Sequence, residues 1–301
     1  MAEDQLTPFI SIVVPVYNDW EGLAYCLQSI STQVHPPAFE VIVVDDGNES
    51  QAPDSIYAIA RDIAEFKLVP IAHVGASGAR NYGTTISRGG LILFVDSDCT
   101  LEQNCLYELA TSCHKYPGEV AFQLRITGED GGIVGRSERL HLSTEQSVLL
   151  RPDSHIRWLC TAGFAIRRQT IPDLGVIFNP KAIRAQDTYL LCELMVRGKL
   201  PFYVADATVT HCVRLSFAKY LYKAVATASA INRTYAAVER RGIRFQCTNL
   251  ERLQMLSVLF ESAGQNSFGY DALAVVLVRK ALKKLGIAVS RLAVGNGNVG
   301  Q

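Results

Sequence analysis

Alternation of apolar strand patterns with helical patterns over the first hundred residues is the feature that most restricts the fold. The β-branched segment at residues 9–18 is typical of a strand, and a helical spacing of apolar side chains follows it, with Asp19 in the N-cap position. Segments 39–47, 66–73 and 91–98 predict three more strands, with helical patterns between them. Because these strands are apolar on both faces, we expect an α/β fold with a mostly parallel sheet flanked by helices.

Polar side chains stand where the predicted strands end. They are Tyr17 and Asn18, Asp45 and Asp46, and Asp96 and Asp98. In a parallel sheet, ligands bind beyond the carboxyl ends of the strands, so these side chains are expected to share a site. An aspartate at a strand end can also be only a turn former or a helix cap, and that alternative stays open for each residue taken alone.

The turn after the first strand excludes two common phosphate-binding loops. It reads VYNDWEG and contains neither the G-x-G-x-x-G pattern nor a P-loop. A divalent cation offers another way to hold a diphosphate. Mg²⁺ and Mn²⁺ prefer oxygen ligands and often bind one or two protein carboxylates together with substrate phosphates, so Asp98 is a candidate metal ligand.

Composition is that of a globular protein. The 301 residues are 49% apolar and 19% charged, and no apolar run of about 18 residues is long enough to span a membrane. The N-terminus lacks a basic region followed by an apolar one, so no export signal is expected. The eight cysteines contain no C-x-x-C pair and are expected to be reduced thiols. These features predict a cytoplasmic protein, with peripheral binding to the inner face of the cell membrane as an open alternative.

Charge is distributed unevenly along the chain. Residues 1–213 carry 16 Lys or Arg against 25 Asp or Glu, whereas residues 214–301 carry 13 against 4. The acidic part is expected to contain cation sites, and the basic part is expected to bind anions. We therefore separate a main domain, 1–213, from a basic helical C-terminal extension, 214–301.

Two amphipathic helices are predicted in the extension, at 216–241 and 271–292. The apolar stripe of the first consists of Phe217, Leu221, Val225, Ala228, Ile231, Tyr235 and Val238. Both helices could pack on the main domain with solvated lysines outside. Alternatively, they could form a surface that lies on an anionic bilayer and reaches a lipid-linked acceptor, which the excess of positive charge favours.

Five segments, taken in order, resemble one known family. SIVVPVYN, FEVIVVDDG, SGARNYG, LILFVDSD and AQDTYLLCELMVRG together resemble the family 2 glycosyltransferases with the GT-A fold, over roughly residues 9–212. The resemblance implies an enzyme of the hexosyltransferase type that moves a sugar from a nucleotide diphosphate sugar, most often a UDP-sugar, with inversion at the anomeric carbon. It implies Mn²⁺ or Mg²⁺ as cofactor, a nucleotide-sugar half at about 1–100 and an acceptor half at about 101–213.

Several residues receive nucleotide-binding roles from this resemblance. Tyr17 is expected to stack on the base, with Pro15 lining the same pocket, and Asp46 to hydrogen-bond the base. Arg80 is expected to lie beside the nucleotide, and Asp96 to face the ribose.

The metal and the diphosphate are assigned by resemblance to Asp98. His211 ends a predicted strand, and the resemblance implies that it joins the metal or the diphosphate. Many histidines at strand ends have no such role, so that alternative stays open.

The resemblance assigns the catalytic base to Asp187. Gln186 precedes it, where the family usually has a glutamate, and Ala162 and Gly163 lie in a segment that resembles the acceptor side. From the residues alone, Asp187 lies in the first turn of a helix, where a plain helix cap is the alternative.

The acceptor is expected to be a sugar or a lipid-linked hydroxyl in polysaccharide or glycolipid synthesis. No nucleic acid is expected as a partner, and an oligomer stays open. A sugar nucleotidyltransferase is a second hypothesis, although it would need a glycine-rich basic loop after the first strand. A non-catalytic sugar-nucleotide-binding protein is a third hypothesis. The presence of Asp187 argues against it, whereas Gln186, in place of the usual glutamate, slightly favours it.

Overall fold

The structure is a computed structural model, and it describes residues 10–129, 131–170, 177–179, 185–239, 242, 247–264 and 268–296. Within α7 and α9, the side chains of 229–230, 232–237, 239 and 290–296 are not described. The strands are β1 (Ile10–Val16), β2 (Phe39–Asp45), β3 (Phe66–Pro70), β4 (Leu91–Phe94), β5 (Cys99–Leu101), β6 (Ala121–Gly128), β7 (Phe164–Arg167) and β8 (Phe202–His211). The helices are α1 (Trp20–Ser31), α2 (Asp54–Ala60), α3 (Gly75–Ile86), α4 (Cys105–Lys115), α5 (Gly132–Leu149), α6 (Gln186–Val196), α7 (Phe217–Glu239), α8 (Asn249–Gly264) and α9 (Tyr270–Asn296).

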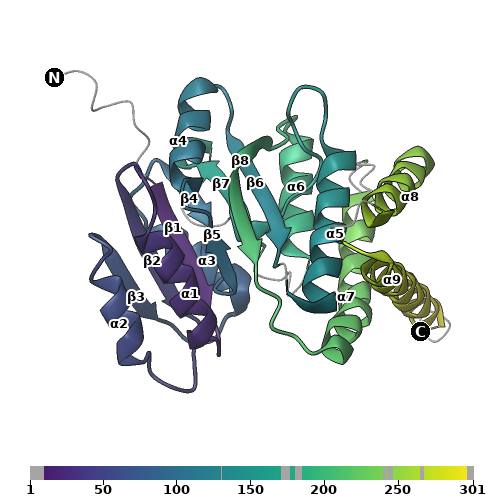
Figure 1. Cartoon of the computed structure of the whole chain (residues 1–301), viewed down its shortest axis with the longest axis horizontal. Coiled ribbons are helices and arrows are strands. Elements are labelled where there is room, and N and C mark those ends of the chain that lie inside the picture. Colours follow the sequence, from purple (N-terminus) through teal and green to yellow (C-terminus); the bar gives the residue numbers. More distant parts are fainter. Residues whose placement is uncertain are drawn as a thin grey trace.

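All the strands of the described residues belong to one mixed sheet, in the order β3-β2-β1-β4-β7-β6-β8-β5 (Figure 1). β3, β2, β1 and β4 are parallel, as the alternating sequence pattern predicts. β7 is antiparallel to both of its neighbours, and β5 is antiparallel to β8. The first half of the sheet is therefore a parallel α/β unit, and the second half is mixed.

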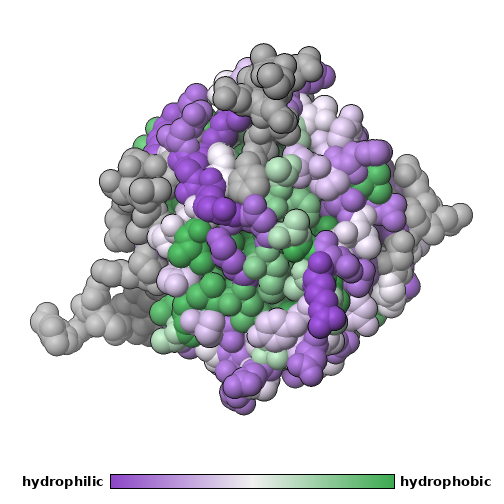
Figure 2. Space-filling model, turned by 90° about the vertical axis from the view of Figure 1, so that its left-hand side faces the viewer, coloured by the Kyte–Doolittle hydropathy of each residue, from purple (hydrophilic) through white to green (hydrophobic). Residues whose placement is uncertain are grey.

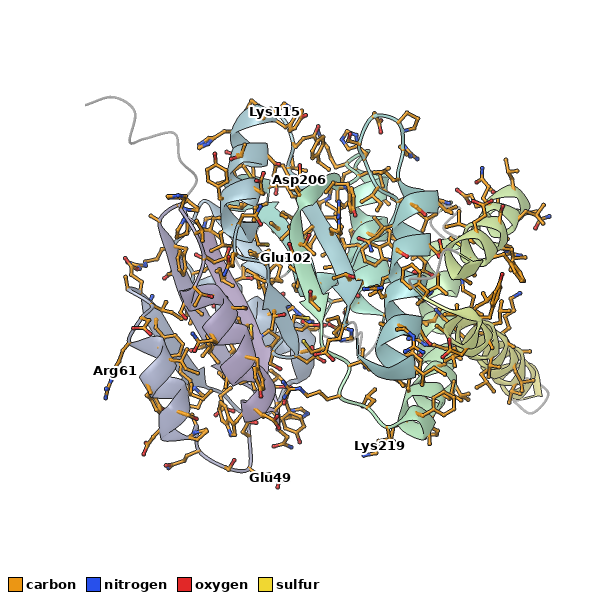
Figure 3. The ribbon with its side chains drawn as sticks, in the orientation of Figure 1. Glu49, Arg61, Glu102, Lys115, Asp206 and Lys219 are labelled. Carbon is orange, nitrogen blue, oxygen red and sulfur yellow. The ribbon has the colours of Figure 1, made fainter. Side chains whose placement is uncertain are left out.

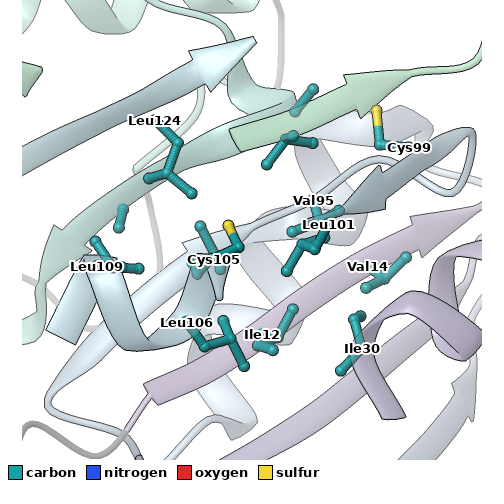
Figure 4. Close-up of a cluster of buried hydrophobic side chains, with 14 of the residues drawn as sticks. Ile12, Val14, Ile30, Val95, Cys99, Leu101, Cys105, Leu106, Leu109 and Leu124 are labelled. Carbon is teal, nitrogen blue, oxygen red and sulfur yellow. The ribbon is translucent and has the colours of Figure 1, made fainter. Parts of the chain in front are cut away.

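Different helices cover the two faces of the sheet, because successive side chains of a strand point to opposite sides. Ile12 and Val14 of β1 pack with residues of α1, α2 and α4, a cluster that Figure 4 shows in close-up. Val13, between them, packs with residues of α6 on the other face. This arrangement explains why β1, β2 and β4 consist mostly of apolar residues. The Asp19 side chain accepts a hydrogen bond from the Gly22 amide and caps α1, which confirms that prediction.

β3 forms one edge of the sheet. Figure 2 views the molecule from the side of β3 and α2 and shows hydrophobic areas bordered by hydrophilic side chains. Within β3, Lys67 and Pro70 are exposed. Lysine and proline oppose pairing with a further strand, so they protect this edge.

The C-terminal helices pack on the main domain through α5. Leu140 of α5 is fully buried against Leu259 of α8 and Val276 of α9. α7 and α9 approach each other closely, because a Cβ at Gly286 would lie only 2.7 Å from the Cβ of Ala228. One face of the extension therefore packs on the protein, while the boundary at residue 213 remains a prediction.

The predicted stripe of α7 is partly wrong. Phe217 and Val225 are exposed, whereas Tyr220 and Ala224, outside the predicted stripe, are buried. Ala228 is buried as predicted. The small side chains of Ala224 and Ala228 allow α9 to lie close to α7. The buried face of α7 therefore passes through Tyr220 and these alanines. Val238 is buried as expected, and the side chain of Tyr235 is outside the described residues. None of the helices described is long and apolar enough to cross a membrane.

Candidate active site

The carboxyl ends of β1, β2 and β4 open into a pocket of about 270 Å³. Its lining includes Pro15, Tyr17, Asp46, Arg80, Asp96 and Asp98. These are the five residues predicted to bind nucleotide and the principal residue predicted to bind metal. They come together because β1, β2 and β4 are parallel and end at the same edge of the sheet, where Arg80 of α3 also lies.

The two aspartates after β2 have different surroundings. The Asp45 carboxylate accepts hydrogen bonds from the backbone and the side-chain amide of Asn48, so it shapes the turn. Asp46 is only 2% exposed, and it accepts from the backbone amide of Val74 at 2.8 Å. Its other oxygen lies 3.0 Å from Nδ1 of His73. Of the two carboxylates, Asp46 is the one that reaches the pocket.

An aromatic ring stands at the mouth of this pocket. The Tyr17 side chain is 49% exposed, and its ring centroid lies 4.4 Å from that of His73. Sequence reasoning found no role for His73. His73 ends the third predicted strand, at the same edge of the sheet as the ends of the first two. That position could have indicated a role in the pocket.

Arg80 connects the pocket to the start of α6. The guanidinium is almost fully buried and donates to the Asp96 carboxylate. Its Nη1 also donates to Oε1 of Gln186 at 2.9 Å. A residue of α3 therefore links the end of β4 to the residue that precedes Asp187.

Asp187 lies in the first turn of α6 but is not its cap. The cap position is Ala185, which has a left-handed backbone (φ +59°) and makes no side-chain cap hydrogen bond. The Asp187 carboxylate instead accepts from the hydroxyl of Thr161 at 3.2 Å. Burial raises the pKa of Asp187 above its ordinary value, the charge of Arg80 opposes this shift, and the charge of Asp96 adds to it. A buried carboxyl with a raised pKa, close to the Arg80 and Asp96 side chains that line the pocket, is a candidate acid or base.

Asp98, Cys99 and His211 form a possible metal site, with one ligand atom of each within 4.8 Å of the others. His211 is placed by the antiparallel pairing of β8 with β5, in which it lies opposite Cys99. Nε2 of His211 lies 3.4 Å from the Asp98 carboxylate. Burial raises the pKa of the Cys99 thiol well above its ordinary value, and carboxylate oxygens suit cations such as Mn²⁺ and Mg²⁺ better than sulfur does. Asp98 and His211 are the two groups that fit a divalent cation.

Glu138 of α5 is a neighbour of this site that sequence reasoning missed. Its Oε1 lies 3.9 Å from Nδ1 of His211. Its Oε2 accepts from the Tyr220 hydroxyl at 2.7 Å and from Arg279 at 2.5 Å. Burial opposes ionisation of Glu138, but the Arg279 charge and these other contacts lower its pKa to about 2. No sequence signal connects these residues, because their partners lie in helices far along the chain.

Ala162 and Gly163, predicted to admit the acceptor, are buried in the turn before β7. A Cβ at Gly163 would lie 2.6 Å from Cδ1 of Ile126 and 3.3 Å from Cγ2 of Val209. That side of the backbone is therefore filled by the core. Close packing against Ile126 and Val209 therefore explains the glycine at position 163. An acceptor could approach Gly163 only from the side of the backbone away from these two residues.

The family model of glycosyl transferase family 2 matches residues 11–174. The chain therefore belongs to this family. Glycosyltransferase AglE of Haloferax volcanii is 34% identical over 102 residues, which cover 33% of this chain and 33% of AglE. The chain thus matches about a third of the length of AglE. The uncharacterized glycosyltransferase YibD of Escherichia coli is 24% identical over 252 residues, covering 75% of this chain and 72% of YibD.

Solved structures confirm the GT-A fold. Mannosyltransferase PcManGT from Pyrobaculum calidifontis, in complex with GDP-Man and Mn²⁺, has a TM-score of 0.58 at 16% identity, covering 98% of this chain and 80% of PcManGT. S. aureus TarS 1-349 in complex with UDP-GlcNAc has a TM-score of 0.56 at 15% identity. The match covers 97% of this chain and 93% of that TarS chain. At these identities the likeness concerns the fold.

Proposed function

We propose that this chain is a metal-dependent inverting glycosyltransferase that moves a sugar from a nucleotide diphosphate sugar to an acceptor hydroxyl. The bridge that Arg80 makes between Asp96 and Gln186 is the observation that carries the proposal. It brings the start of α6, with Asp187, to the pocket at the strand ends. A donor in the pocket would then have a candidate base beside its sugar.

The donor pocket suits a nucleotide. The half-exposed Tyr17 ring offers a stacking surface for the base, and Pro15 forms part of the same wall. Asp46 offers carboxylate oxygens that can accept from a base N–H, and Asp96 would face the ribose. The UDP-GlcNAc complex of TarS supports a UDP-sugar as donor.

A divalent cation would be held by Asp98 and His211. When bound, such a cation neutralises charge on the leaving diphosphate. A carboxylate beside an imidazole favours Mn²⁺ over Mg²⁺, because Mg²⁺ takes oxygen ligands whereas the transition-metal ion Mn²⁺ also binds imidazole nitrogen. The Mn²⁺ complex of PcManGT supports this choice.

Asp187 would act as the general base. It takes the proton of the acceptor hydroxyl while that oxygen forms a bond to the anomeric carbon, on the face opposite the breaking bond to the diphosphate. This single displacement inverts the anomeric configuration. Such base catalysis contributes on the order of 10²–10⁴ in rate. Gln186 would keep Arg80 in place without adding a second charge beside the base.

The acceptor remains a proposal: a sugar or lipid-linked hydroxyl in polysaccharide or glycolipid synthesis, reached from an anionic membrane surface. Family membership favours transfer over the nucleotidyltransferase and non-catalytic alternatives.

Incubation with a panel of UDP- and GDP-sugars and Mn²⁺ tests the proposal, with release of nucleoside diphosphate as the readout. Slow release without acceptor, and faster release with an added acceptor sugar or a lipid-linked sugar, is the expected result. The anomeric configuration of the product, read by NMR, tests inversion. Release of pyrophosphate, or no turnover with any donor that binds, would overturn the proposal.

A further inference from the structure

A second, larger pocket lies between α5, α7, α8 and α9, away from the strand ends. Its volume is about 780 Å³. Apolar residues of α8 and α9 form much of its wall, among them Met255, Leu256, Leu259, Val276 and Leu277. None of the residues assigned to the donor pocket lines it.

Positive charges gather in this pocket. Arg252, Lys280, Lys283 and Lys284 line it, and none of these four forms an ion pair with another described residue. Arg279 also lines it, but its guanidinium is paired with Glu138. Among the described residues these four charges therefore form no close ion pair, in contrast to Arg80 of the donor pocket, which is paired with Asp96.

The pocket contains one described carboxylate, that of Glu145. It is already engaged, because it accepts from Trp158 Nε1 at 3.1 Å and lies 3.7 Å from His141. Nδ1 of His141 is buried and has no hydrogen-bond partner among the described residues. Burial lowers the pKa of Lys283, the Glu145 charge opposes this shift, and the neighbouring Arg279 and Lys280 charges add to it.

Large apolar side chains are exposed on the same two helices. On α8, Leu250 and Leu253 are 65% and 64% exposed, and on α9, Leu285 and Val289 are 61% and 58% exposed. They do not line the pocket. Exposed apolar residues beside unpaired cations are typical of helices that lie in the interface of an anionic bilayer.

We propose that this pocket binds one anionic phospholipid, with its phosphate on Lys280, Lys283 and Lys284 and an acyl chain along the apolar residues of α8 and α9. A free phosphate would satisfy the charges but leave the apolar wall exposed to water. A lipid satisfies both, and the exposed leucines allow the helices to rest on the bilayer that supplies it. This binding site is separate from the donor site, so it does not depend on the transfer reaction.

Calorimetry with dihexanoyl phosphatidylglycerol below its micelle concentration tests the proposal, with inorganic phosphate and dihexanoyl phosphatidylcholine as comparisons. The anionic lipid is expected to bind tightest. The double variant Lys283→Ala, Lys284→Ala should bind the anionic lipid roughly thirtyfold more weakly, because each of the two lysines contributes about a fivefold gain in affinity for an anionic group. Lys115→Ala with Lys199→Ala removes the same charge from exposed sites elsewhere, and Figure 3 labels Lys115 at the end of α4. This control should bind as the parent does.

A second pair of variants tests the apolar wall. Ala288→Trp should block the pocket, whereas Ala274→Trp, on the same helix and also exposed, should not, since Ala274 does not line the pocket. Equal affinity for inorganic phosphate and the anionic lipid would overturn the proposal. So would equal binding by all four variants, or no binding of the lipid by the parent protein. UDP binding in the presence of Mn²⁺, measured on the same samples, reports the donor site independently.

Discussion

The carboxylate of Glu138 lies 3.9 Å from Nδ1 of His211, whose other ring nitrogen lies 3.4 Å from Asp98. A histidine that binds a metal is usually oriented by a carboxylate or carbonyl at its second nitrogen. Glu138 has this position, and Tyr220 and Arg279 hold it in place. Through Glu138, the C-terminal helices α7 and α9 contact the candidate metal site.

Glu138→Gln is therefore expected to weaken Mn²⁺ binding about tenfold or more, because an amide orients the imidazole less firmly. Titration of Mn²⁺ into the protein saturated with UDP measures this effect. Glu261→Gln, an exposed glutamate of α8, is the control. An unchanged Mn²⁺ affinity in a folded Glu138→Gln protein would show that Glu138 only holds the helices together.

Asp98→Ala is expected to abolish the part of nucleotide binding that depends on metal, because cations of this class need an oxygen ligand. UDP affinity is measured by calorimetry with Mn²⁺ and with a chelator. The parent protein should bind UDP more tightly with Mn²⁺ than with the chelator, whereas Asp98→Ala should bind UDP equally under both conditions. Glu102→Ala, at an exposed carboxylate labelled in Figure 3, should behave as the parent. A variant that keeps the Mn²⁺ effect would remove Asp98 from the metal site.

Asp187→Asn is expected to lower turnover at least roughly 10²-fold while donor affinity stays nearly unchanged. The amide keeps the shape of the side chain but cannot accept the proton of the acceptor. Initial rates and donor binding are measured on the same preparation. Glu193→Gln, on the same helix, is the matched control. Turnover close to that of the parent would reduce Asp187 to a structural residue of α6.

Thr161→Val is expected to move the acid limb of the pH–rate profile to higher pH. A general base works in its ionised form, so activity falls as the pH drops through the pKa of Asp187. The pKa of Asp187 is already raised by burial, and the Thr161 hydroxyl bond opposes that shift. Removing this bond should raise the pKa further. Thr161→Ser keeps the hydroxyl and should restore the profile, and an unmoved limb in Thr161→Val would contradict the assignment of the base.

Glu40→Gln is expected to lower the free energy of unfolding by about 2 kcal/mol at pH 7, since Glu40 is 1% exposed and makes charge-assisted hydrogen bonds. Ser11 donates to it at 2.7 Å and the Arg88 backbone amide at 2.6 Å. Burial opposes its ionisation, but the Ser11 bond and the other contacts outweigh this and lower its pKa to about 2.

Because the folded pKa of Glu40 is lower than the unfolded one, its contribution is present above about pH 4.5 and is lost as the pH falls towards 2. The difference between parent and variant in urea unfolding should therefore shrink between these values. A difference that stays constant down to pH 2.5 would contradict the role of the charge.

The parallel half of the fold could be predicted from local patterns. β1, β2 and β4 are mostly apolar, because residues buried on both faces of a sheet are mostly apolar, and a helical spacing follows each of β1, β2 and β3. The same patterns place Tyr17, Asp46 and Asp98 at strand ends, and parallel strands bring their ends to one edge. A pocket at this edge with these residues in its wall was therefore predictable.

Contacts between distant segments required the tertiary structure. Glu138 meets Arg279, 141 residues further along the chain, and Thr161 meets Asp187, 26 residues further along. The aspartates Asp45 and Asp46 are neighbours in sequence, yet only the surrounding turn and loop decide which one reaches the pocket. The buried face of α7 was partly mispredicted for the same reason, since packing against other helices buries Tyr220 and Ala224 instead of Phe217 and Val225. Local sequence determines which segments become strands and helices, because backbone preferences and apolar spacing act within a few residues. The partners of a side chain depend on how all those segments pack, which no short stretch of sequence contains.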